Sequence, residues 1–423
     1  MTLSPEVIKM LAKYSINEKG KAPYFKRSKT PEDVIKTVES LNRFYIENYG
    51  KIFLRIEDDI CPSENTNQPE SDIPKKNFHK LKMLAEQGDL DAQFKLGEYY
   101  WDMSCSADEE DEEEKYKKEC VNWYKKAALQ NHIPSQLMLG EIYETGINEY
   151  ENYEEAAKWY LLAAEQGDIC GQASLADLYY DDGEYEEAAK WYKKAAKQGH
   201  IESQYRLGEY YEYEEDDCDE AAEWYEKAAK QGHAESQYRL GEYYNNKEKY
   251  KETAKWFKKA AEQNNADAQF KLGEYYLYGY CGFRVNEEEG IKWLTLASEN
   301  GNENAQYILG ISYEFGNSVE KDMEKAFKLY KKAAEKDHEQ AQTQLGLCYL
   351  NGDGTEENPE KAFKWFKKAA KNDDSEGQYY LGWCYQNAIG VEKNLEKACK
   401  WYKEAAEQGD EDAEERLSEI MKM

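Results

Sequence analysis

Histidine is the side chain most often used for acid–base catalysis and metal binding near neutral pH. The chain has five, at positions 79, 132, 200, 233 and 338. The last four fall at equivalent places of a repeated sequence described below, so successive copies are one repeat unit apart. Such spacing argues against a shared metal ion, and we expect these histidines to occupy turns or to cap helices.

Other residue patterns that carry chemistry are missing from the sequence. It contains no phosphate-binding G-x-x-x-x-G-K-[ST], no G-x-G-x-x-G, no nucleophile G-x-S-x-G and no zinc-binding H-E-x-x-H. The nine cysteines form no C-x-x-C pair, which favours reduced packing residues over a disulfide framework. We expect no enzymatic activity, no cofactor and no metal.

Charge is the strongest compositional signal. The formal net charge is −30, and residues 1–75 are balanced with 12 basic and 12 acidic residues, so the whole excess lies in residues 76–423. Such a surface repels nucleic acid and anionic lipid and favours basic protein segments. The sequence has no run of 18 apolar residues, and its first residues lack the features of a secretory signal. We expect a cytoplasmic protein.

The elements that would position any binding residues come from an internal repeat. The dipeptide Leu-Gly recurs with a tyrosine three residues after the glycine in most copies. Spacings between successive glycines run from 32 to 43 residues. The glycines are Gly97, Gly140, Gly208, Gly241, Gly273, Gly310, Gly346 and Gly382, with Ala176 once in their place.

A second pattern lies between these glycines: a small residue, an aromatic residue four positions later and an alanine three positions after that. Ala188, Tyr192 and Ala195 are one copy. Offsets of four and seven place all three on one helical face. Each unit therefore predicts two antiparallel helices, with Gly-Asp, Gly-His or Asn-Asn ending the second. Because glycine within a helix costs about 1 kcal/mol, we expect it to allow close approach to the alanines of the partner helix.

These residues resemble the Sel-one-like repeat family, relatives of the tetratricopeptide repeats. The resemblance rests on A-x-x-x-L-G-x-x-Y at Ala92–Tyr100 and on E-K-A-x-K-W-Y-x-K-A-A-E-Q-G-D, nearly complete at Leu395–Asp410. It implies an all-α fold, an α/α superhelical solenoid of about nine to ten helix pairs over residues 75–423. The family implies adaptors, scaffolds and neutralisers of toxic enzymes, without shared catalytic residues.

The remaining parts of the chain fit the repeat less well. Residues 1–60 predict a small amino-terminal α or α+β segment of unknown role, with helices at Thr2–Tyr14 and Thr30–Asn48 and a short strand at Ile52–Ile56. Residues 61–74 have the composition of a linker. The acidic runs Asp108–Glu114 and Glu212–Glu220 predict solvated loops, with a docking patch for a basic partner as the alternative.

The family resemblance implies that the first helix of each pair lines a concave binding face. Acidic residues stand one position after the glycines up to Gly273, and apolar residues replace them from Gly310 onward. Aromatic residues stand three positions before the glycine in most copies. Acids beside aromatic rings suit a segment rich in Lys or Arg, although the rings can also serve as packing. The predicted partner-binding residues are Phe94, Glu98, Glu141, Asp177, Tyr205, Glu209, Tyr238, Glu242, Phe270, Glu274, Tyr307, Ile311, Leu347 and Trp383.

The sequence therefore predicts a noncatalytic protein–protein adaptor or scaffold that holds a basic partner segment in an acidic, aromatic groove. The alternative is a stoichiometric inhibitor, of the antitoxin or immunity type, that blocks a partner enzyme. A third hypothesis is an activity in the amino-terminal segment. The apolar residues near the carboxyl terminus leave self-association open.

Overall fold

The computed structural model describes residues 75–107, 109–145 and 152–422, and these residues form helices joined by short turns. The predicted segments within residues 1–74 lie outside the described residues. In the described part, no strand occurs and no helix is long and apolar enough to cross a membrane. The predicted all-α repeat solenoid is confirmed.

The helices alternate between two kinds. The first helices are α4 (Leu90–Cys105), α6 (Ile133–Glu144), α8 (Ile169–Asp181), α10 (Ile201–Tyr213), α12 (Ala234–Asn246), α14 (Ala266–Tyr278), α16 (Glu303–Phe315), α18 (Glu339–Asn351), α20 (Ser375–Asn387) and α22 (Glu411–Met421). They carry the Leu-Gly dipeptides, with Leu-Ala in α8 and Leu-Ser in α22. The second helices are α3 (Lys75–Glu86), α5 (Glu110–Ala128), α7 (Tyr153–Glu165), α9 (Tyr185–Lys197), α11 (Cys218–Lys230), α13 (Tyr250–Glu262), α15 (Glu287–Glu299), α17 (Met323–Glu335), α19 (Pro359–Lys371) and α21 (Leu395–Glu407). A short 3₁₀ turn, Tyr280–Gly282, follows α14.

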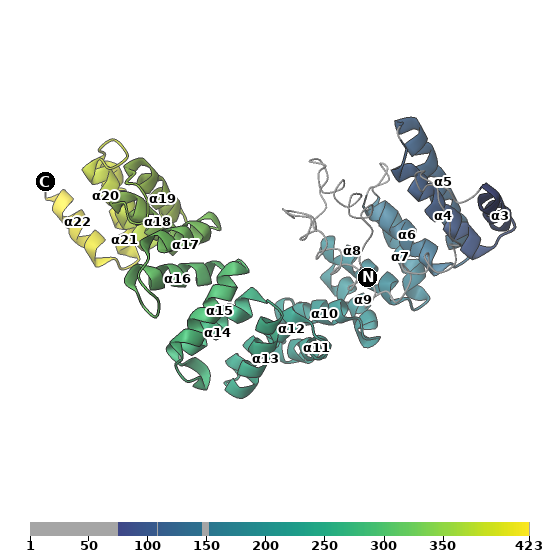
Figure 1. Ribbon diagram of the computed structural model, residues 1–423, viewed down its shortest axis with the longest axis horizontal. Coiled ribbons are helices and arrows are strands. Elements are labelled where there is room, and N and C mark those ends of the chain that lie inside the picture. The colour runs from purple at the N-terminus through teal and green to yellow at the C-terminus, as the bar shows by residue number, and fades with distance from the viewer. Residues whose placement is uncertain (1–74, 108, 146–151, 423) are drawn as a thin grey trace, which may run out of the picture. The chain divides into compact units, whose positions relative to one another are not determined.

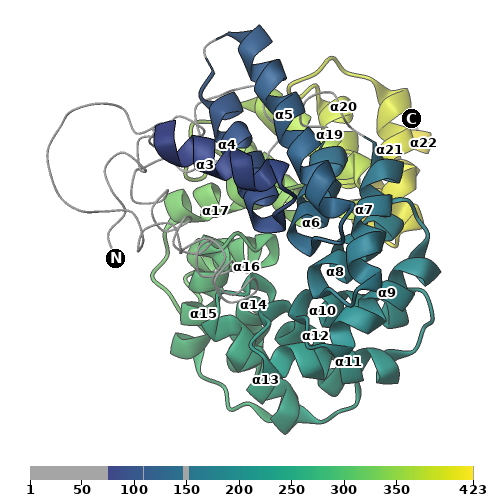
Figure 2. The same cartoon turned by 90° about the vertical axis from the view of Figure 1, so that its right-hand side faces the viewer.

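Each helix packs against the next one along the chain, as Figures 1 and 2 show. Alanines of the second helices and leucines of the first helices fill the core. A single helix pair could not bury enough apolar surface alone, so stacked pairs must share their core. The core is accordingly a series of buried clusters that follow one another along the array.

The turn from a second helix to the next first helix repeats one geometry. After α7, Gly167 adopts a positive φ of 89°, and Asp168 then caps α8 by accepting a hydrogen bond from the Gly171 amide at 2.7 Å. Left-handed backbone after a helix suits glycine, and a carboxylate satisfies an otherwise unpaired amide at a helix start. The recurrent Gln-Gly-Asp sequence is thus a helix end followed directly by a helix start.

The prediction that the Leu-Gly glycine contacts alanines of the partner helix is wrong. A Cβ on Gly208 would come 2.5 Å from Cε1 of Tyr225, and Gly346 faces the ring of Phe366 in the same way. Most of these glycines therefore make room for the aromatic ring of the second helix, and Gly273 makes room for Leu294; none of them faces the alanines. Among the glycines of the described residues, those in the first turn of α8 and α20 have alanine as their neighbour, such as Gly171 against Ala163.

The acidic run at 108–114 was predicted to be a solvated loop, and this prediction is also wrong for most of the run. Helix α5 begins at Glu110 and is 19 residues long, so most of the run forms its first turn. Carboxylates are favourable there because they face the positive end of the helix dipole. Extra helix, and not only an extended loop, accounts for the spacing of 43 residues in this repeat.

A chain of side-chain amides links successive repeats. Gln204 of α10 donates from Nε2 to the Ala196 carbonyl at 3.0 Å, and its Oε1 accepts a hydrogen bond from Nε2 of Gln231 at 2.8 Å. Ala196 belongs to the second helix before α10, and Gln231 follows the second helix after it. We call this pair of hydrogen bonds a rung. Buried amides need such partners, and equivalent rungs centre on Gln93, Gln136, Gln172, Gln237, Gln269 and Gln342.

Candidate functional site

We define the first-helix face as the surface formed by the sides of the first helices that carry the predicted partner-binding residues. The glycine–ring packing brings hydroxyl groups of the second helices to this face. The Tyr160 hydroxyl donates to Glu144 at 2.7 Å, and the Tyr330 hydroxyl donates to Glu314 at 2.6 Å. In each case the acceptor lies four residues after the first-helix glycine. Sequence reasoning missed these carboxylates, although their constant offset from the glycine is visible in the sequence.

The predicted aromatic row consists largely of packing residues. Tyr205 lies 5.8 Å from the ring of Tyr225 and 4.9 Å from the ring of His233, measured between centroids. Tyr307 contacts Tyr330 and His338 in the same way. Phe94 and Tyr238 are likewise half-buried against aromatic rings of the next second helix. Phe270 is only 9% exposed and belongs to a core cluster.

Part of the predicted acid row is already paired within the chain. Arg206 donates from Nη1 to Glu209 at 3.0 Å, and Arg239 lies 3.8 Å from Glu242. Lys271 pairs with Glu274 at 3.5 Å in the same register, three residues apart. The hydroxyls of the tyrosines four residues before Glu209 and Glu242 donate to the same carboxylates, at 2.7 and 2.8 Å. The central part of the row therefore offers little free negative charge.

The acids on α6 and α8 have different surroundings. Glu141, Glu144, Asp177 and Asp181 form no ion pair within the described residues. Burial raises the pKa of Glu144, and the charges of the other three carboxylates raise it further. Like charges act on one another in this way only when they are close. We call these four residues the α6–α8 acid patch.

The pKa values of the predicted acids in this region follow the same pattern. Glu141 lies at the exposed surface of α6, but the protein packed around its carboxyl group removes water from it and raises its pKa. Burial also raises the pKa of Asp177, while the hydroxyl of Tyr192, which donates at 2.5 Å, and then Arg206 lower it. On α4, burial and then the charge of Asp102 raise the pKa of Glu98. Each of these carboxylates is thus less stable as an anion than in water and would gain from a cation brought to it.

The apolar residues that replace the acids toward the carboxyl terminus are not a free patch. Ile311, Leu347 and Trp383 are half-buried and pack against the largest core cluster, which is built from α17–α22. Neighbouring first helices thus cover much of their surface, and a row of apolar residues at a helix interface is expected in a stacked array.

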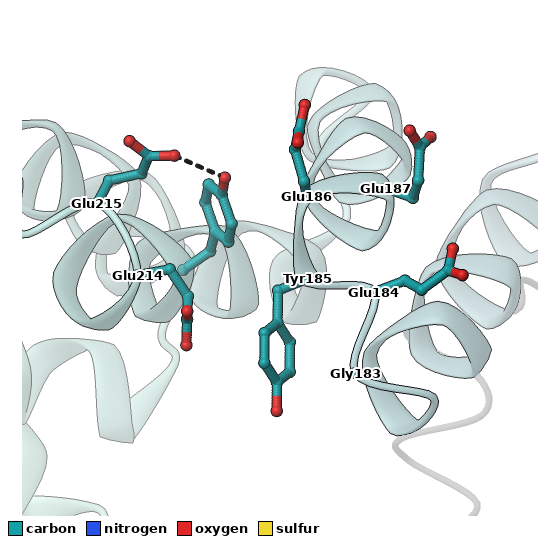
Figure 3. Close-up of a pocket in the computed structure, with 8 residues that line it drawn as sticks. Gly183, Glu184, Tyr185, Glu186, Glu187, Glu214 and Glu215 are labelled. Carbon is teal, nitrogen blue, oxygen red and sulfur yellow. Dashed lines mark hydrogen bonds between the residues drawn. The ribbon is translucent and has the colours of Figure 1, made fainter.

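A second acidic feature lies at the turn before α9. A cavity of about 460 Å³ is lined by Gly183, Glu184, Tyr185, Glu186, Glu187, Tyr210, Glu214 and Glu215. Tyr210 donates to Glu215 at 2.8 Å, and Figure 3 shows the labelled carboxylates pointing in different directions. A metal ion needs several oxygens aimed at one point. The described residues contain no group of three or more such ligands placed for a metal.

The recurrent histidines are helix caps, as predicted for them. His200 and His233 stand directly before α10 and α12. Their Nδ1 atoms accept hydrogen bonds from the amides of Ser203 and Ser236, at 3.3 and 3.2 Å. His338 caps α18 through the amide of Ala341. At His132 the side chain contacts the Ser135 hydroxyl instead, at 2.8 Å. Because an accepting Nδ1 must be deprotonated, the caps require neutral histidine.

Two solved structures of repeat proteins are similar to this chain. A protective antigen present in uropathogenic Escherichia coli strains, which displays an SLR fold, is 25% identical with a TM-score of 0.51, covering 100% of this chain and 91% of its own. A Sel1 repeat protein from Oxalobacter formigenes is 32% identical with a TM-score of 0.49, covering 55% of this chain and 96% of its own. No curated protein sequence matches the chain.

The family model for the Sel1 repeat matches ten regions of the sequence. They are residues 90–102, 114–132, 133–168, 171–200, 201–233, 234–265, 266–302, 304–338, 339–374 and 375–410. These regions make up well over half of the chain and coincide with the successive helix pairs. The chain belongs to the Sel1 repeat family.

Proposed function

We propose that this protein is a noncatalytic adaptor or scaffold that binds a partner protein through a basic segment on its first-helix face. The general role in protein–protein interaction follows from the Sel1 repeat architecture, in which stacked helix pairs present a long surface. The basic partner and its position on the face are the proposal. Family membership alone cannot choose them, since function lies in sites carried on a fold.

The observation that carries the proposal is the unequal neutralisation of the acids along the face. Glu209, Glu242 and Glu274 each have a basic partner three residues earlier. The corresponding positions before Glu141 and Asp177 hold Met138 and Ser174, which carry no charge. The α6–α8 acid patch is therefore the part of the face where an incoming cation would meet carboxylates without an ion-pair partner, although Arg206 acts on Asp177 from a longer distance.

The chemistry of this patch favours Arg and Lys side chains over small cations. Its carboxylates lie on two successive first helices and near tyrosine hydroxyls that already occupy some of their oxygens. The described residues form no compact ligand set for a metal. Long, flexible basic side chains can reach separate carboxylates along a surface, and complementary charge also steers association.

Capture from native lysate with the full chain, at low and high salt, tests the proposal. The variant is Glu141→Lys with Asp181→Lys, because neither side chain serves as a hydrogen-bond acceptor for a core tyrosine. The matched control is Glu223→Lys with Glu360→Lys, which reverses two exposed acids on second helices. We expect one dominant partner that both salt and the patch variant remove, while the control keeps it, since exposed charge pairs are screened over about 10 Å or less.

A partner that binds the patch variant as well as the natural chain, regardless of salt, would contradict the basic-segment proposal. In the same experiment, Glu209→Lys with Glu242→Lys separates the paired from the unpaired acids. We expect this variant to retain more of the partner than the patch variant, because its targets are already neutralised within the chain.

A further inference from the structure

The rung centred on Gln306 lacks the second of its two hydrogen bonds. Gln306 of α16 donates to the Ser298 carbonyl at 3.1 Å, as in the other repeats. Its Oε1, however, is a buried acceptor without a hydrogen-bond donor, and the residue is only 3% exposed. The side chain that would donate is Lys336, where other repeats have Gln or Asn. Its ammonium group donates to the Gly301 carbonyl instead.

The equivalent glutamine elsewhere shows what is lost. Nε2 of Gln198 reaches both the Gly167 carbonyl, at 3.1 Å, and Oε1 of Gln172, at 2.9 Å. One amide thus ties the end of a second helix to the preceding turn and to the first helix of its own repeat. Lys336 makes only the first of these two connections, so the end of α17 is not tied to Gln306.

The buried core changes at the same place. Successive core clusters share a helix: α8 contributes Leu175 to one and Ala176 to the next. Helices α5, α11, α13 and α14 are shared in the same way. At α16 and α17 the fully buried members stop at Leu309 and resume at Ala326, with no helix in common. Apart from Tyr330, which packs over Gly310, the apolar side chains that cross this boundary are half-buried, such as Ile311 and Leu329.

The two helices remain connected away from the open rung. The ring of Tyr330 lies over Gly310, and its hydroxyl donates to Glu314 at 2.6 Å. These contacts hold the middle and the carboxyl-terminal end of α16. The missing hydrogen bond lies at the other end, between Gln306 and the end of α17. At that end Lys336 still reaches the Gly301 carbonyl and Tyr307 still contacts His338, but the side-chain amide that ties the two helices together in other repeats is missing. The helix pair is therefore held more completely at one end than at the other, as a hinge requires.

We propose that the junction of α16 and α17 is a built-in hinge at which α17–α22 moves as one unit relative to the preceding helices. Local opening is favoured where the connections between packed elements are incomplete. Two independent features, the orphaned Oε1 of Gln306 and the break between core clusters, coincide at this junction. Such a hinge would let a long binding surface adapt to its partner, with local opening confined to the end of α17.

Hydrogen–deuterium exchange of the full chain, resolved by mass spectrometry, tests the hinge. We expect amides in the last turn of α17 to exchange about tenfold faster than those in the last turn of α13, where the rung of Gln237 and Gln263 is intact. Lys336→Gln should supply the missing donor and remove most of this difference. Equal exchange at the two helix ends of the natural chain would overturn the proposal.

Two further variants separate the hinge from a general change in stability. Lys336→Met removes the ammonium group without supplying an amide, so it should leave the fast exchange in place. Gln263→Lys should transfer fast exchange to the end of α13. Circular dichroism checks that each variant keeps its helix content. The proposal would be wrong if Lys336→Met slowed amide exchange at the end of α17 as much as Lys336→Gln does. It would also be wrong if Gln263→Lys left amide exchange at the end of α13 unchanged.

Discussion

The ring of Tyr330 occupies the space that a side chain on Gly310 would need: a Cβ built there lies 2.5 Å from Cε1 of the ring. Both residues are buried, so the ring cannot move without disturbing its neighbours. Overpacking of this kind costs about 1–3 kcal/mol. We predict that Gly310→Ala lowers the free energy of unfolding by about this amount, measured by thermal or urea denaturation.

A double-mutant cycle identifies the cause of that loss. If the ring is responsible, Gly310→Ala should cost much less in a background of Tyr330→Leu, because the smaller side chain leaves room for the methyl group. Additive losses would instead mean that the glycine serves another purpose at this position.

The Leu-Gly glycines show which features of the helix packing could be predicted from the sequence. Their recurrence predicted paired helices and a close approach, and the helices exist. The identity of the neighbour could not be read from spacing, because Ala326, Tyr330 and Ala333 lie on the same helical face and any of them could meet Gly310. Only packing in three dimensions selects the ring.

The row of acids one position after the glycines was also only partly predictable from the sequence. The sequence predicted a uniform row of acids, yet the structure divides it into paired and unpaired members. The signal was present, since Arg206 precedes Glu209 by three residues and this spacing brings helical side chains together. The repulsion between carboxylates of α6 and α8, and the burial that raises the pKa of Glu141, depend on how helices stack. Those features could not be derived from one helix at a time.

The histidine caps predict a loss of stability in mild acid. Burial lowers the pKa of His200 and of His233 below the value of 6.5 expected for the unfolded chain. In mild acid the unfolded state then binds more protons than the folded state. The stabilisation by the histidine caps is therefore complete above pH 6.5, and it is lost as the pH falls through the pKa of these histidines in the folded protein. We expect the melting temperature to fall between pH 7.5 and pH 5.5.

Asparagine provides the matched test of these caps, because Asn265 and Asn302 fill the same position in other repeats. His200→Asn combined with His233→Asn keeps a capping acceptor that does not titrate. This variant should lose less stability than the natural chain between the two pH values. An identical pH dependence would mean that other groups control it.

The cysteines predict a simple pattern of chemical reactivity. Burial raises the pKa of Cys120, Cys348 and Cys384 to about 12, whereas Cys105 and Cys218 are exposed. The thiolate is the reactive form, and a buried thiol is also inaccessible. Iodoacetamide at pH 8 should modify the two exposed cysteines at least about tenfold faster than the three buried ones. Peptide mass spectrometry measures this, and denatured protein, where the rates should converge, is the control.

Glu141 is a position where stability and the proposed binding should oppose each other. Burial raises the pKa of its carboxyl, so the folded protein favours the protonated form more than the unfolded chain does. Between the ordinary value of 4.5 and the raised value, the folded state binds more protons, and stability therefore falls as the pH rises. Glu141→Gln removes the charge while keeping the shape, and we expect it to raise the melting temperature at pH 7 but not at pH 4.

The same substitution should weaken capture of a basic partner, because it removes one uncompensated charge from the α6–α8 acid patch. Glu223→Gln, on an exposed side of α11, is the control, with an expected change in stability within about 0.5 kcal/mol and unchanged capture. A residue that costs stability and supports binding is typical of a functional surface. If Glu141→Gln instead stabilises the protein and leaves capture intact, the charge at this position serves no partner, and the patch would have to be placed elsewhere on the first-helix face.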